Sequence, residues 1–308
     1  NYKYLKVAII LGGESSEKDI SLLTGISVSE AIGSVYETEL VYLGDNINIL
    51  PEKLIDYDII FNALHGGIGE NGDIQSFLDL HQIEYCGSGA KASKIAMDKH
   101  LSKMIAKNES IPTPKWIFVK SDNYNTQLLN KESIKINAPY IVKPSDEGST
   151  VGLTLVDTLD GLGDAIQLSG EFSKNILIEE YISGRELTVG ILGNKPLPII
   201  EIVPDGELYD YDAKYTTGKS KYEVPAKLPG KLSRRIQNDA LKIYNTIGCR
   251  HYARVDFRLN EADEHFFLEV NTLPGMTSNS LFPKAAANAG LKFPELIDTI
   301  IKIAMVDQ

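Results

Sequence analysis

The alternation of apolar runs with helical segments in the first third of the chain is the feature that most restricts its fold. Residues 5–11 (LKVAIIL) form an apolar run, as expected of a strand buried on both faces of a parallel sheet. The run stops at Gly12-Gly13, and a helical stretch follows from Ser15 or Ser16 to about Gly33. Strands at 38–44, 57–66 and 83–89 and a helix at 71–82 continue the pattern. It predicts a doubly wound parallel sheet.

The remaining two thirds of the chain have more closely spaced strands, which is typical of α+β lobes. A helix is predicted at 97–108, and the two prolines of SIPTPK (110–115) end it. Other helices are predicted near 158–169, 230–247 and 293–304, and strands at 116–120, 138–143, 151–156, 174–182, 186–193, 197–203, 207–215, 252–259 and 265–271. We therefore expect an α/β domain at 1–90, a central α+β lobe at 91–182 and a C-terminal α+β lobe at 183–308.

Composition excludes several classes of protein. The 308 residues carry 42 acidic and 31 basic side chains, a net charge of −11 that disfavours nucleic acid and anionic membranes as partners. No apolar run approaches the roughly 18 residues that a membrane span needs. Only Cys86 and Cys249 are present, too few for a disulfide framework. We expect a cytoplasmic protein with small-molecule partners.

The glycine-rich segment GIGENG (67–72) matches the dinucleotide-binding pattern GxGxxG. Dinucleotide binding requires the motif on the first strand–helix turn, whereas GIGENG follows roughly the third strand. The alternatives are a plain glycine-rich turn and a loop in which His65 and Glu70 face a ligand. No GxxxxGK[ST] sequence occurs, which excludes a Walker P-loop but not other ways of binding ATP.

The loop KPSDEGSTVG (143–152) joins two apolar strands and is a candidate phosphate site. Backbone N–H groups near Gly148 and Gly152 are suited to phosphate oxygens, and Lys143 supplies positive charge. Taken alone, a solvated Gly-Ser hairpin loop explains the same residues.

The hairpin at 253–271 carries the strongest chemical signal. With its turn centred on 260–263, Arg254 opposes Glu269 and Asp256 opposes Phe267. Alternation then places Val255, Phe257, Leu268 and Val270 on a core face, and Arg254, Asp256, Glu269 and Asn271 on the other face. Two carboxylates and an amide oxygen are ligands suited to Mg²⁺. The alternative is a solvated face with one cross-strand ion pair.

Two further segments fit a site of this kind. The loop after the hairpin, NTLPGMTSNSLFPKAA (271–286), leads to a helix expected at about Pro283, with Ser280 near its N-terminus as an anion site. The cluster YDYDAKYTTGKSKY (209–222) is either a surface loop or a lid in which Lys214 and Tyr215 close over a nucleotide.

The order of these motifs resembles that of the D-alanine–D-alanine ligases of the ATP-grasp superfamily, from about residue 7 to residue 302. The matching stretches are GGESSEKDISLLTG, ALHGGIGENGDIQ, YCGSGAKASKIAMDK, VKPSDEGSTVG, ILIEEYISGRELTVGIL, RVD with FRLN, and EVNTLPGMTSNSLFPKAA. The resemblance implies an ATP-dependent ligation of two D-alanine molecules through an acyl phosphate, for peptidoglycan precursors. It also implies two Mg²⁺ ions, with Mn²⁺ as a substitute, and a homodimer.

The resemblance also assigns roles to individual residues. The catalytic set is Glu17, Ser149, Tyr215, Arg254, Gly275 and Ser280, and the metal ligands are Asp256, Glu269 and Asn271. The D-alanine contacts are Glu17, His65, Arg254, Gly275, Ser280 and Leu281. The ATP contacts are Lys99, Lys143, Glu147, Gly148, Ser149, Val151, Glu179, Glu180, Tyr181, Ile182, Glu186, Lys214, Phe257, Leu268 and Glu269. An ATP-grasp ligase for other amino acids, or for a D-alanine/D-hydroxy-acid pair, is the alternative; Tyr215 favours amino-acid use.

Overall fold

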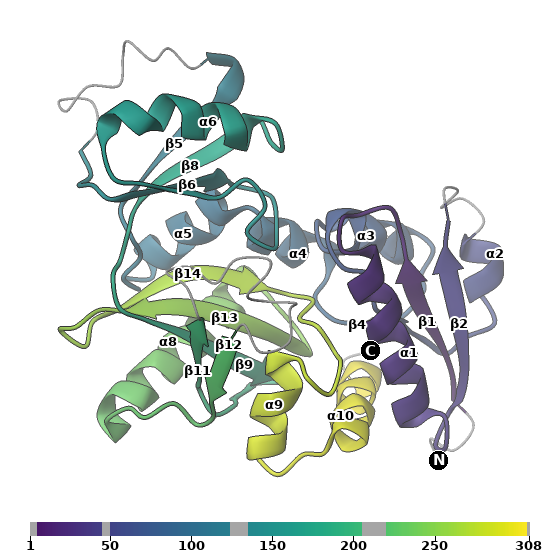
Figure 1. Cartoon of the computed structure of the whole chain (residues 1–308). Helices are drawn as coiled ribbons and strands as arrows, with labels where there is room; N and C mark the ends of the chain where they lie inside the picture. The colour runs from purple at the N-terminus through teal and green to yellow at the C-terminus, as the bar shows by residue number, and fades with distance from the viewer. Residues whose placement is uncertain (1–4, 45–49, 124–134, 205–219, 307–308) are drawn as a thin grey trace.

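The computed structural model describes residues 5–44, 50–123, 135–204 and 220–306. Three β-sheets organise this part of the chain: a four-stranded sheet within 6–86, a four-stranded sheet within 116–180 and a six-stranded sheet within 185–271. In Figure 1 the first sheet stands to one side, and the second lies above the third. The predicted α/β domain followed by two α+β lobes is therefore confirmed.

The first sheet is parallel throughout. Its strands are β1 (Lys6–Gly12), β2 (Glu37–Leu43), β3 (Ile59–Asn62) and β4 (Tyr85–Cys86), in the order β2-β1-β3-β4. Because side chains alternate along a strand, Val7, Ile9 and Leu11 pack into one core cluster while Ala8 and Ile10 pack into another. The sheet is thus buried on both faces, as the apolar run predicts.

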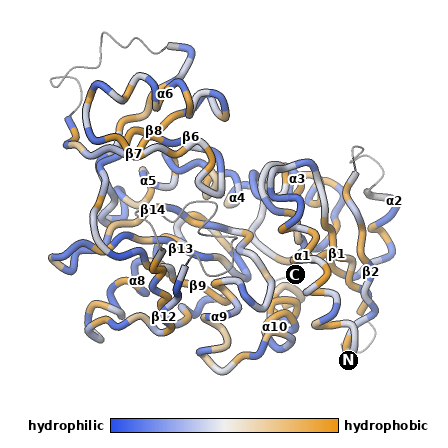
Figure 2. The backbone as a smooth tube through the Cα atoms, viewed as in Figure 1, coloured by the Kyte–Doolittle hydropathy of each residue, from blue (hydrophilic) through white to orange (hydrophobic). Residues whose placement is uncertain are grey.

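Helices cover both faces of this sheet. Helices α1 (Lys18–Ile32) and α10 (Phe293–Val306) join the core cluster on one face, and α2 (Leu50–Leu54) and α3 (Asp73–Leu80) join that on the other. Helix α10 belongs to the last part of the chain yet contacts α1, β3 and β4 (Figure 1). Figure 2 shows hydrophobic residues gathered on the strands and polar residues on the outward turns.

The GIGENG segment follows the carboxyl end of β3. Its first residues form the 3-10 helix η3 (Gly67–Gly69), and Gly72, with φ +94°, precedes α3. The motif is therefore not on the first strand–helix turn, and the dinucleotide hypothesis loses its structural basis.

The second sheet is antiparallel. It consists of β5 (Trp116–Lys120), β6 (Tyr140–Pro144), β7 (Thr154–Val156) and β8 (Asn175–Glu180), in the order β5-β8-β6-β7. Helix α6 (Leu162–Gly170) packs on it, and the 3-10 helices η4 (Ser121–Asn123) and η6 (Leu159–Gly161) flank these elements. The loop between β6 and β7 is the predicted phosphate loop.

The helix predicted at 97–108 is present as α5 (Lys99–Asn108), and a second helix that was not predicted, α4 (Ala90–Met97), precedes it. The two are separated at Asp98, whose carboxylate accepts the N–H groups of His100 (2.9 Å) and Leu101 (3.3 Å) and caps α5. Both helices pack against β14 of the third sheet, and α5 also contacts the second sheet, where His100 stacks on Phe118 of β5. The domain limits 1–90, 91–182 and 183–308 stay a prediction.

The third sheet is antiparallel and has the order β12-β11-β9-β13-β14, with β10 beside β9. These strands are β9 (Arg185–Leu192), β10 (Lys195–Pro196), β11 (Ile200–Pro204), β12 (Ser220–Glu223), β13 (Tyr252–Leu259) and β14 (His265–Asn271). Helix α8 (Gly230–Ile247) covers one face, and α9 (Leu281–Asn288) follows the hairpin. The strand predicted at 207–215 lies outside the described residues.

The hairpin register differs from the predicted one. Asp256 opposes Glu269, and Arg254 opposes Asn271. After Asp256 the register shifts by one residue, so that Phe257 opposes Phe267 and Leu268 has no partner. A bulge of this kind turns the extra residue out of strict alternation. Leu268 is consequently half-buried and faces a cavity rather than the core, which corrects its predicted position.

No helix in the described ranges is both long enough and apolar enough to cross a membrane.

Candidate active site

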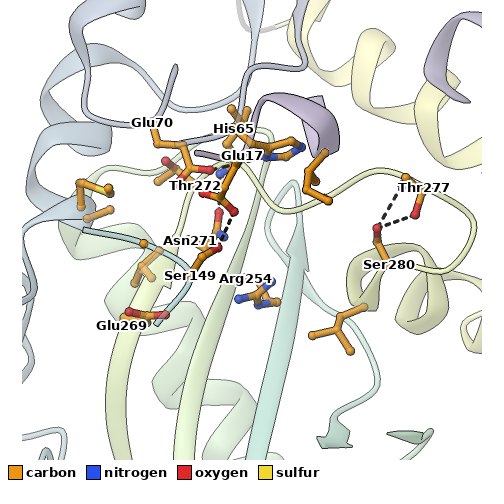
Figure 3. Close-up of a pocket in the computed structure, with 18 of the residues that line it drawn as sticks. Glu17, His65, Glu70, Ser149, Arg254, Glu269, Asn271, Thr272, Thr277 and Ser280 are labelled. Carbon is orange, nitrogen blue, oxygen red and sulfur yellow. Dashed lines mark hydrogen bonds and ion pairs between the residues drawn. The ribbon is translucent and has the colours of Figure 1, made fainter. Parts of the chain in front are cut away.

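Two adjoining cavities lie where the three sheets meet. The larger, of about 490 Å³, is bordered by α1, the loop after β3, the hairpin and the loop that leads to α9 (Figure 3). The smaller, of about 130 Å³, lies between the second sheet and the hairpin. Lys99, Gly148, Ser149 and Glu269 border both cavities, so that they form one continuous cleft.

The loop between β6 and β7 crosses from the second sheet to the first domain. The Ser149 hydroxyl donates a hydrogen bond to Glu17 Oε1 (Figure 3). A Cβ added to Gly148 would lie 3.6 Å from Glu17 Oε2. Ser149 and Thr150 have φ values of +50° and +65°, in the left-handed region that is costly for residues other than glycine. The surrounding contacts hold the loop in this conformation.

A second group from the first domain lies beside Glu17. His65 is buried; its Nε2 is 2.9 Å from Thr24 Oγ1, and its Nδ1 is 3.5 Å from Glu70 Oε1. Both His65 and Glu70 border the larger cavity, which favours the interpretation of this loop as ligand-facing. The imidazole is fixed in orientation by contacts on both ring nitrogens.

Arg254 and Asp256 form a bidentate pair at the base of the cleft. Arg254 Nε and Nη2 donate to the two Asp256 oxygens at 2.9 and 2.8 Å, and the Thr188 hydroxyl donates to Oδ1 at 2.5 Å. Only 8 % of Asp256 is exposed, and it borders neither cavity directly. Arg254 does border the larger one, so its orientation is set from below by this carboxylate.

The donor set of the hairpin fits a divalent cation. Asp256 and Glu269 are direct neighbours across the two strands, and Asn271 is two residues further along β14. Glu269 Oε2 is 3.2 Å from Lys99 Nζ, and Asn271 Oδ1 accepts the Leu273 N–H at 2.8 Å. Carboxylate and amide oxygens are ligands that Mg²⁺ accepts together with substrate phosphates. Within the described ranges no group of three or more His, Cys, Asp or Glu could hold a metal ion by itself.

Lysines converge on the smaller cavity. Lys99 Nζ donates to the Glu147 carbonyl at 2.6 Å, which ties the start of α5 to the phosphate loop. Lys143 Nζ is 3.0 Å from Glu179 Oε2. Although burial raises the pKa of Glu179, Lys103 and Lys143 together bring it below its usual range. Burial and the neighbouring Asp146 raise the pKa of Glu147.

The far end of the smaller cavity is formed by the end of β8 and by Arg258. Arg258 donates to the Ile182 carbonyl at 3.0 Å and to the Gly184 carbonyl at 2.9 Å, and Nη1 is 3.3 Å from Glu186 Oε2. Its guanidinium carbon lies 5.6 Å from the centre of the Tyr181 ring. These contacts fix the segment that follows β8, and its residues Glu180, Tyr181 and Ile182 border the cavity.

The loop that leads to α9 forms the opposite end of the larger cavity. Ser280 Oγ is 2.8 Å from Thr277 Oγ1 and accepts the Thr277 N–H at 3.1 Å (Figure 3). A Cβ on Gly275 would lie only 3.0 Å from Ser280 Oγ. Helix α9 begins at Leu281, two residues before the predicted start, and Ser280 is its N-cap. The helix N-terminus therefore points into the cavity beside a hydroxyl.

Most of the predicted site residues border the cleft. The larger cavity includes Glu17, His65, Lys99, Gly148, Ser149, Arg254, Glu269, Asn271, Gly275, Ser280 and Leu281, and the smaller includes Lys99, Lys143, Glu147, Gly148, Ser149, Val151, Glu179, Glu180, Tyr181, Ile182, Glu186, Leu268 and Glu269. Two predicted residues border neither cavity. Asp256 lies beneath Arg254, to which it is hydrogen-bonded. Phe257 is fully buried in the core between β13, β14 and α8, so its predicted ATP contact is wrong. Lys214 and Tyr215 lie outside the described residues.

Among the residues near the cleft that were not predicted from the sequence, Arg258, Thr188 and Lys284 carry polar groups. Arg258 continues the alternation of Arg254 and Asp256 along β13, and that periodicity was sufficient to find it. Thr188 lies on β9, the strand paired with β13, and contacts Asp256 from there; no local sequence pattern indicates this contact. Lys284 borders the larger cavity from the first turn of α9, as its position four residues after Ser280 allows.

Two antiparallel sheets enclose a cavity lined by lysines, and the hairpin of one sheet carries carboxylates. This arrangement defines an ATP-grasp protein. The family model described as "D-ala D-ala ligase N-terminus" matches residues 45–88, and that described as "D-ala D-ala ligase C-terminus" matches residues 105–302. The chain belongs to the D-alanine–D-alanine ligase family.

Individual relatives agree with this assignment over nearly the whole chain. A D-alanine–D-alanine ligase of Pelotomaculum thermopropionicum is 40% identical, with 98% of this chain and 97% of the relative covered. One of Aquifex aeolicus is 41% identical, with 96% and 100% covered. The crystal structure of the Bacillus anthracis D-alanine–D-alanine ligase complexed with ATP matches with a TM-score of 0.87 at 34% identity, covering 98% of each chain.

Proposed function

We propose that this protein joins two D-alanine molecules at the expense of ATP to give D-alanyl-D-alanine, a precursor of peptidoglycan. The observation that carries the proposal is the continuity of the two cavities: Lys99, Ser149 and Glu269 border both of them, so that a nucleotide in one cavity would adjoin a substrate in the other. Family membership supports the reaction. An unactivated carboxylate is a poor electrophile, so phosphoryl transfer has to supply the driving force.

In the proposed function ATP occupies the smaller cavity. Lys99 and Lys143 neutralise its phosphates, and the loop at 147–152 folds over them with its backbone N–H groups. Glu179 and the chain edge of Glu180, Tyr181 and Ile182 face the adenine, while Glu186 faces the ribose. The ion pair of Arg258 with Glu186 supports this placement, because it leaves the Glu186 carboxylate ionised as an acceptor for ribose hydroxyls.

Asp256, Glu269 and Asn271 hold Mg²⁺ in this proposal, two ions in all, with Mn²⁺ as a substitute. When bound there, the ions would supply positive charge that offsets the negative charge of the phosphates. The bidentate contact of Asp256 with Arg254 fits this role, because a carboxylate has lone pairs for both a guanidinium and a cation.

The first D-alanine binds in the larger cavity with its ammonium group at Glu17 and His65 nearby. Its carboxylate attacks the γ-phosphate of ATP, which releases ADP and leaves an acyl phosphate. Arg254 and the Gly275 N–H stabilise negative charge on the carbonyl oxygen when the second substrate adds. The Asp256 carboxylate orients Arg254 for this task by its two hydrogen bonds.

The second D-alanine binds with its carboxylate at the N-terminus of α9, where the Ser280 hydroxyl and the Leu281 N–H lie. Its amine attacks the acyl phosphate, loses a proton, and expels inorganic phosphate. Holding the reactants together lowers the barrier by up to ~7–11 kcal/mol. The Ser149–Glu17 contact closes the phosphate loop over the first substrate and keeps water from the acyl phosphate.

The setting of the reaction is part of the proposal. We place the protein in the cytoplasm, where ATP is available, and expect a homodimer.

The test is phosphate release from ATP with Mg²⁺ and either D- or L-alanine, with mass analysis of the product. We expect release only with D-alanine, together with the D-alanyl dipeptide. Equal activity with L-amino acids would assign the protein to ligases of other amino acids. A product that contains D-lactate, when D-lactate and D-alanine are both supplied, would assign it to the D-hydroxy-acid type.

A further inference from the structure

A fully buried lysine that the proposed reaction does not use lies behind the smaller cavity. Lys103 follows Lys99 by one turn of α5, and its side chain is 0% exposed. Its Nζ is 3.2 Å from Glu179 Oε1, while Lys143 Nζ is 3.0 Å from Glu179 Oε2. The carboxylate is therefore held between two ammonium groups, one that borders the cavity and one that does not.

The same ammonium group connects the two lobes that enclose the cavity. Lys103 Nζ donates to Thr113 Oγ1 at 2.8 Å, and the Thr113 hydroxyl donates to the Phe267 carbonyl at 2.8 Å. The Phe267 N–H in turn donates to the Pro112 carbonyl at 2.7 Å. Glu179 lies on β8 of the second sheet and Phe267 on β14 of the third. Lys103 thus fixes Glu179 relative to the hairpin below the cavity.

The surroundings keep this pair ionic at neutral pH. Burial lowers the pKa of Lys103 to about 8; Glu179 opposes this shift and Lys143 adds to it. The ring of Trp116, whose centre is 5.1 Å from Lys103 Nζ, also favours the cation. The Glu179 pKa is below its usual range for the reasons given above. At pH 7 the Glu179 carboxylate is therefore an acceptor only, with no proton to donate.

We propose that Lys103 is a positioning residue that makes Glu179 select adenine over guanine. The inference rests on the proposed function, in which Glu179 faces the base. An ionised carboxylate accepts a hydrogen bond from the exocyclic amino group of adenine. It repels the carbonyl oxygen that guanine carries at the same place. Without Lys103 the buried carboxylate loses a cation, so that it can take up a proton and donate to guanine.

The test compares ATP and GTP as phosphoryl donors in the full-length Lys103→Met and Lys103→Arg variants. Lys107→Met is the matched control, because Lys107 lies one turn further along α5 and is exposed. We expect Lys103→Met to raise the KM for ATP about tenfold, to leave kcat within about threefold, and to lower the ATP:GTP ratio of kcat/KM at least about tenfold. Lys103→Arg should recover most of the ratio, and Lys107→Met should leave all three values unchanged.

A double-mutant cycle with Glu179→Gln shows whether Lys103 acts through Glu179. If it does, Lys103→Met changes the ATP:GTP ratio in the wild-type background and has little further effect in the Glu179→Gln background. An unchanged ratio in Lys103→Met, with both nucleotides weakened equally, would overturn the inference, since a merely structural role predicts that result. So would equal effects in the two backgrounds.

Two further measurements keep the test decisive. If Lys103→Met does not fold, Thr113→Val removes the hydrogen bond that holds the ammonium group, and an unchanged ATP:GTP ratio there would also overturn the inference. Trp116 is the only tryptophan in the sequence, so its fluorescence reports nucleotide binding without turnover. If the wild-type protein binds ATP more tightly than GTP by this signal but releases no phosphate with D-alanine, the proposed function is wrong. The effect of Lys103 on the choice of nucleotide can still be measured by binding.

Discussion

The two cavities of the cleft are built in different ways. The smaller is surrounded by buried ion pairs close to one another, such as Lys143 with Glu179, and its elements pack directly on each other. The larger depends on a contact of the phosphate loop with the first domain, that of Ser149 with Glu17. Buried ion pairs thus hold the nucleotide side together, whereas the amino-acid side depends on the position of one loop. Variants on the two sides should therefore fail differently.

The largest effect is expected on the nucleotide side. Lys143→Ala removes a preorganised cation from the phosphates and leaves Glu179 with one partner fewer, so kcat/KM should fall by about 10²–10³, or roughly 2.7–4 kcal/mol. Steady-state kinetics with varied ATP measures this loss. A variant within threefold of the wild type would show that Lys143 does not bind the transferred phosphate.

A smaller effect, confined to the amino-acid side, is expected for Glu17→Gln. Glutamine can still accept the Ser149 hydrogen bond but cannot balance an ammonium group, so kcat/KM for D-alanine should fall about 10–100-fold. The KM for ATP should stay within about twofold, since Glu17 does not border the smaller cavity. Ser149→Ala is the comparison: it keeps the charge and removes only the contact. If Glu17→Gln raised the KM for ATP as much as it lowers kcat/KM for D-alanine, the two cavities would not act separately.

Gly275→Ala tests the other end of the larger cavity. Its Cβ would come within 3.0 Å of Ser280 Oγ, so the hydroxyl has to move away from the proposed carboxylate site. We expect the KM for the second D-alanine to rise about 5–10-fold, the loss of one ordinary hydrogen bond. Kinetics at saturating ATP resolve the two D-alanine sites. Weaker binding of the first D-alanine instead would place Gly275 at the other subsite.

The last prediction concerns stability rather than catalysis, and it is a pH dependence that arises from Lys103. Its pKa in the folded protein, about 8, is below the value of an exposed lysine, so between these two values the unfolded chain binds more protons. The free energy of unfolding contributed by this group should therefore increase as pH rises through that window, by at most about 1.4 kcal/mol per pH unit. Urea unfolding of the wild type and of Lys103→Met at pH 7.5 and about 9.5 isolates the difference. If the free energy of unfolding changes with pH by the same amount in the wild type and in Lys103→Met, the pKa of Lys103 is not lowered.

The sequence predicts the sheets well because their signal is local. The apolar run of β1 and the alternation along β13 each depend on neighbouring residues, and both strands form where expected. The pairing of the hairpin was predicted less well for two reasons. The turn is displaced, so that Leu259 opposes His265, one residue from the predicted register, and the bulge at Leu268 shifts the register by one residue more. The same bulge turns Leu268 towards the nucleotide cavity while Phe257 stays in the core.

The buried charges were harder to predict for a different reason. Helical periodicity places Lys103 on the same side of α5 as Lys99, but it does not show which lysine is buried or which carboxylate faces it. Glu179 comes from β8 and Thr113 from the segment before β5, so the site exists only once three segments are packed together. Contacts of this kind depend on tertiary structure rather than on local pattern.

The position of α10 has a consequence for how the molecule assembles. Leu296, Ile297, Ile300 and Ile301 of this helix are fully buried against the first domain, although most of the sequence separates them from β1. Burying each is worth about 1.5–3 kcal/mol, a sum comparable to the whole stability of a typical domain. During translation the first domain therefore emerges with part of one apolar face, the part not covered by α1, exposed until α10 leaves the ribosome. An isolated fragment of residues 1–90 would expose that face to aggregation.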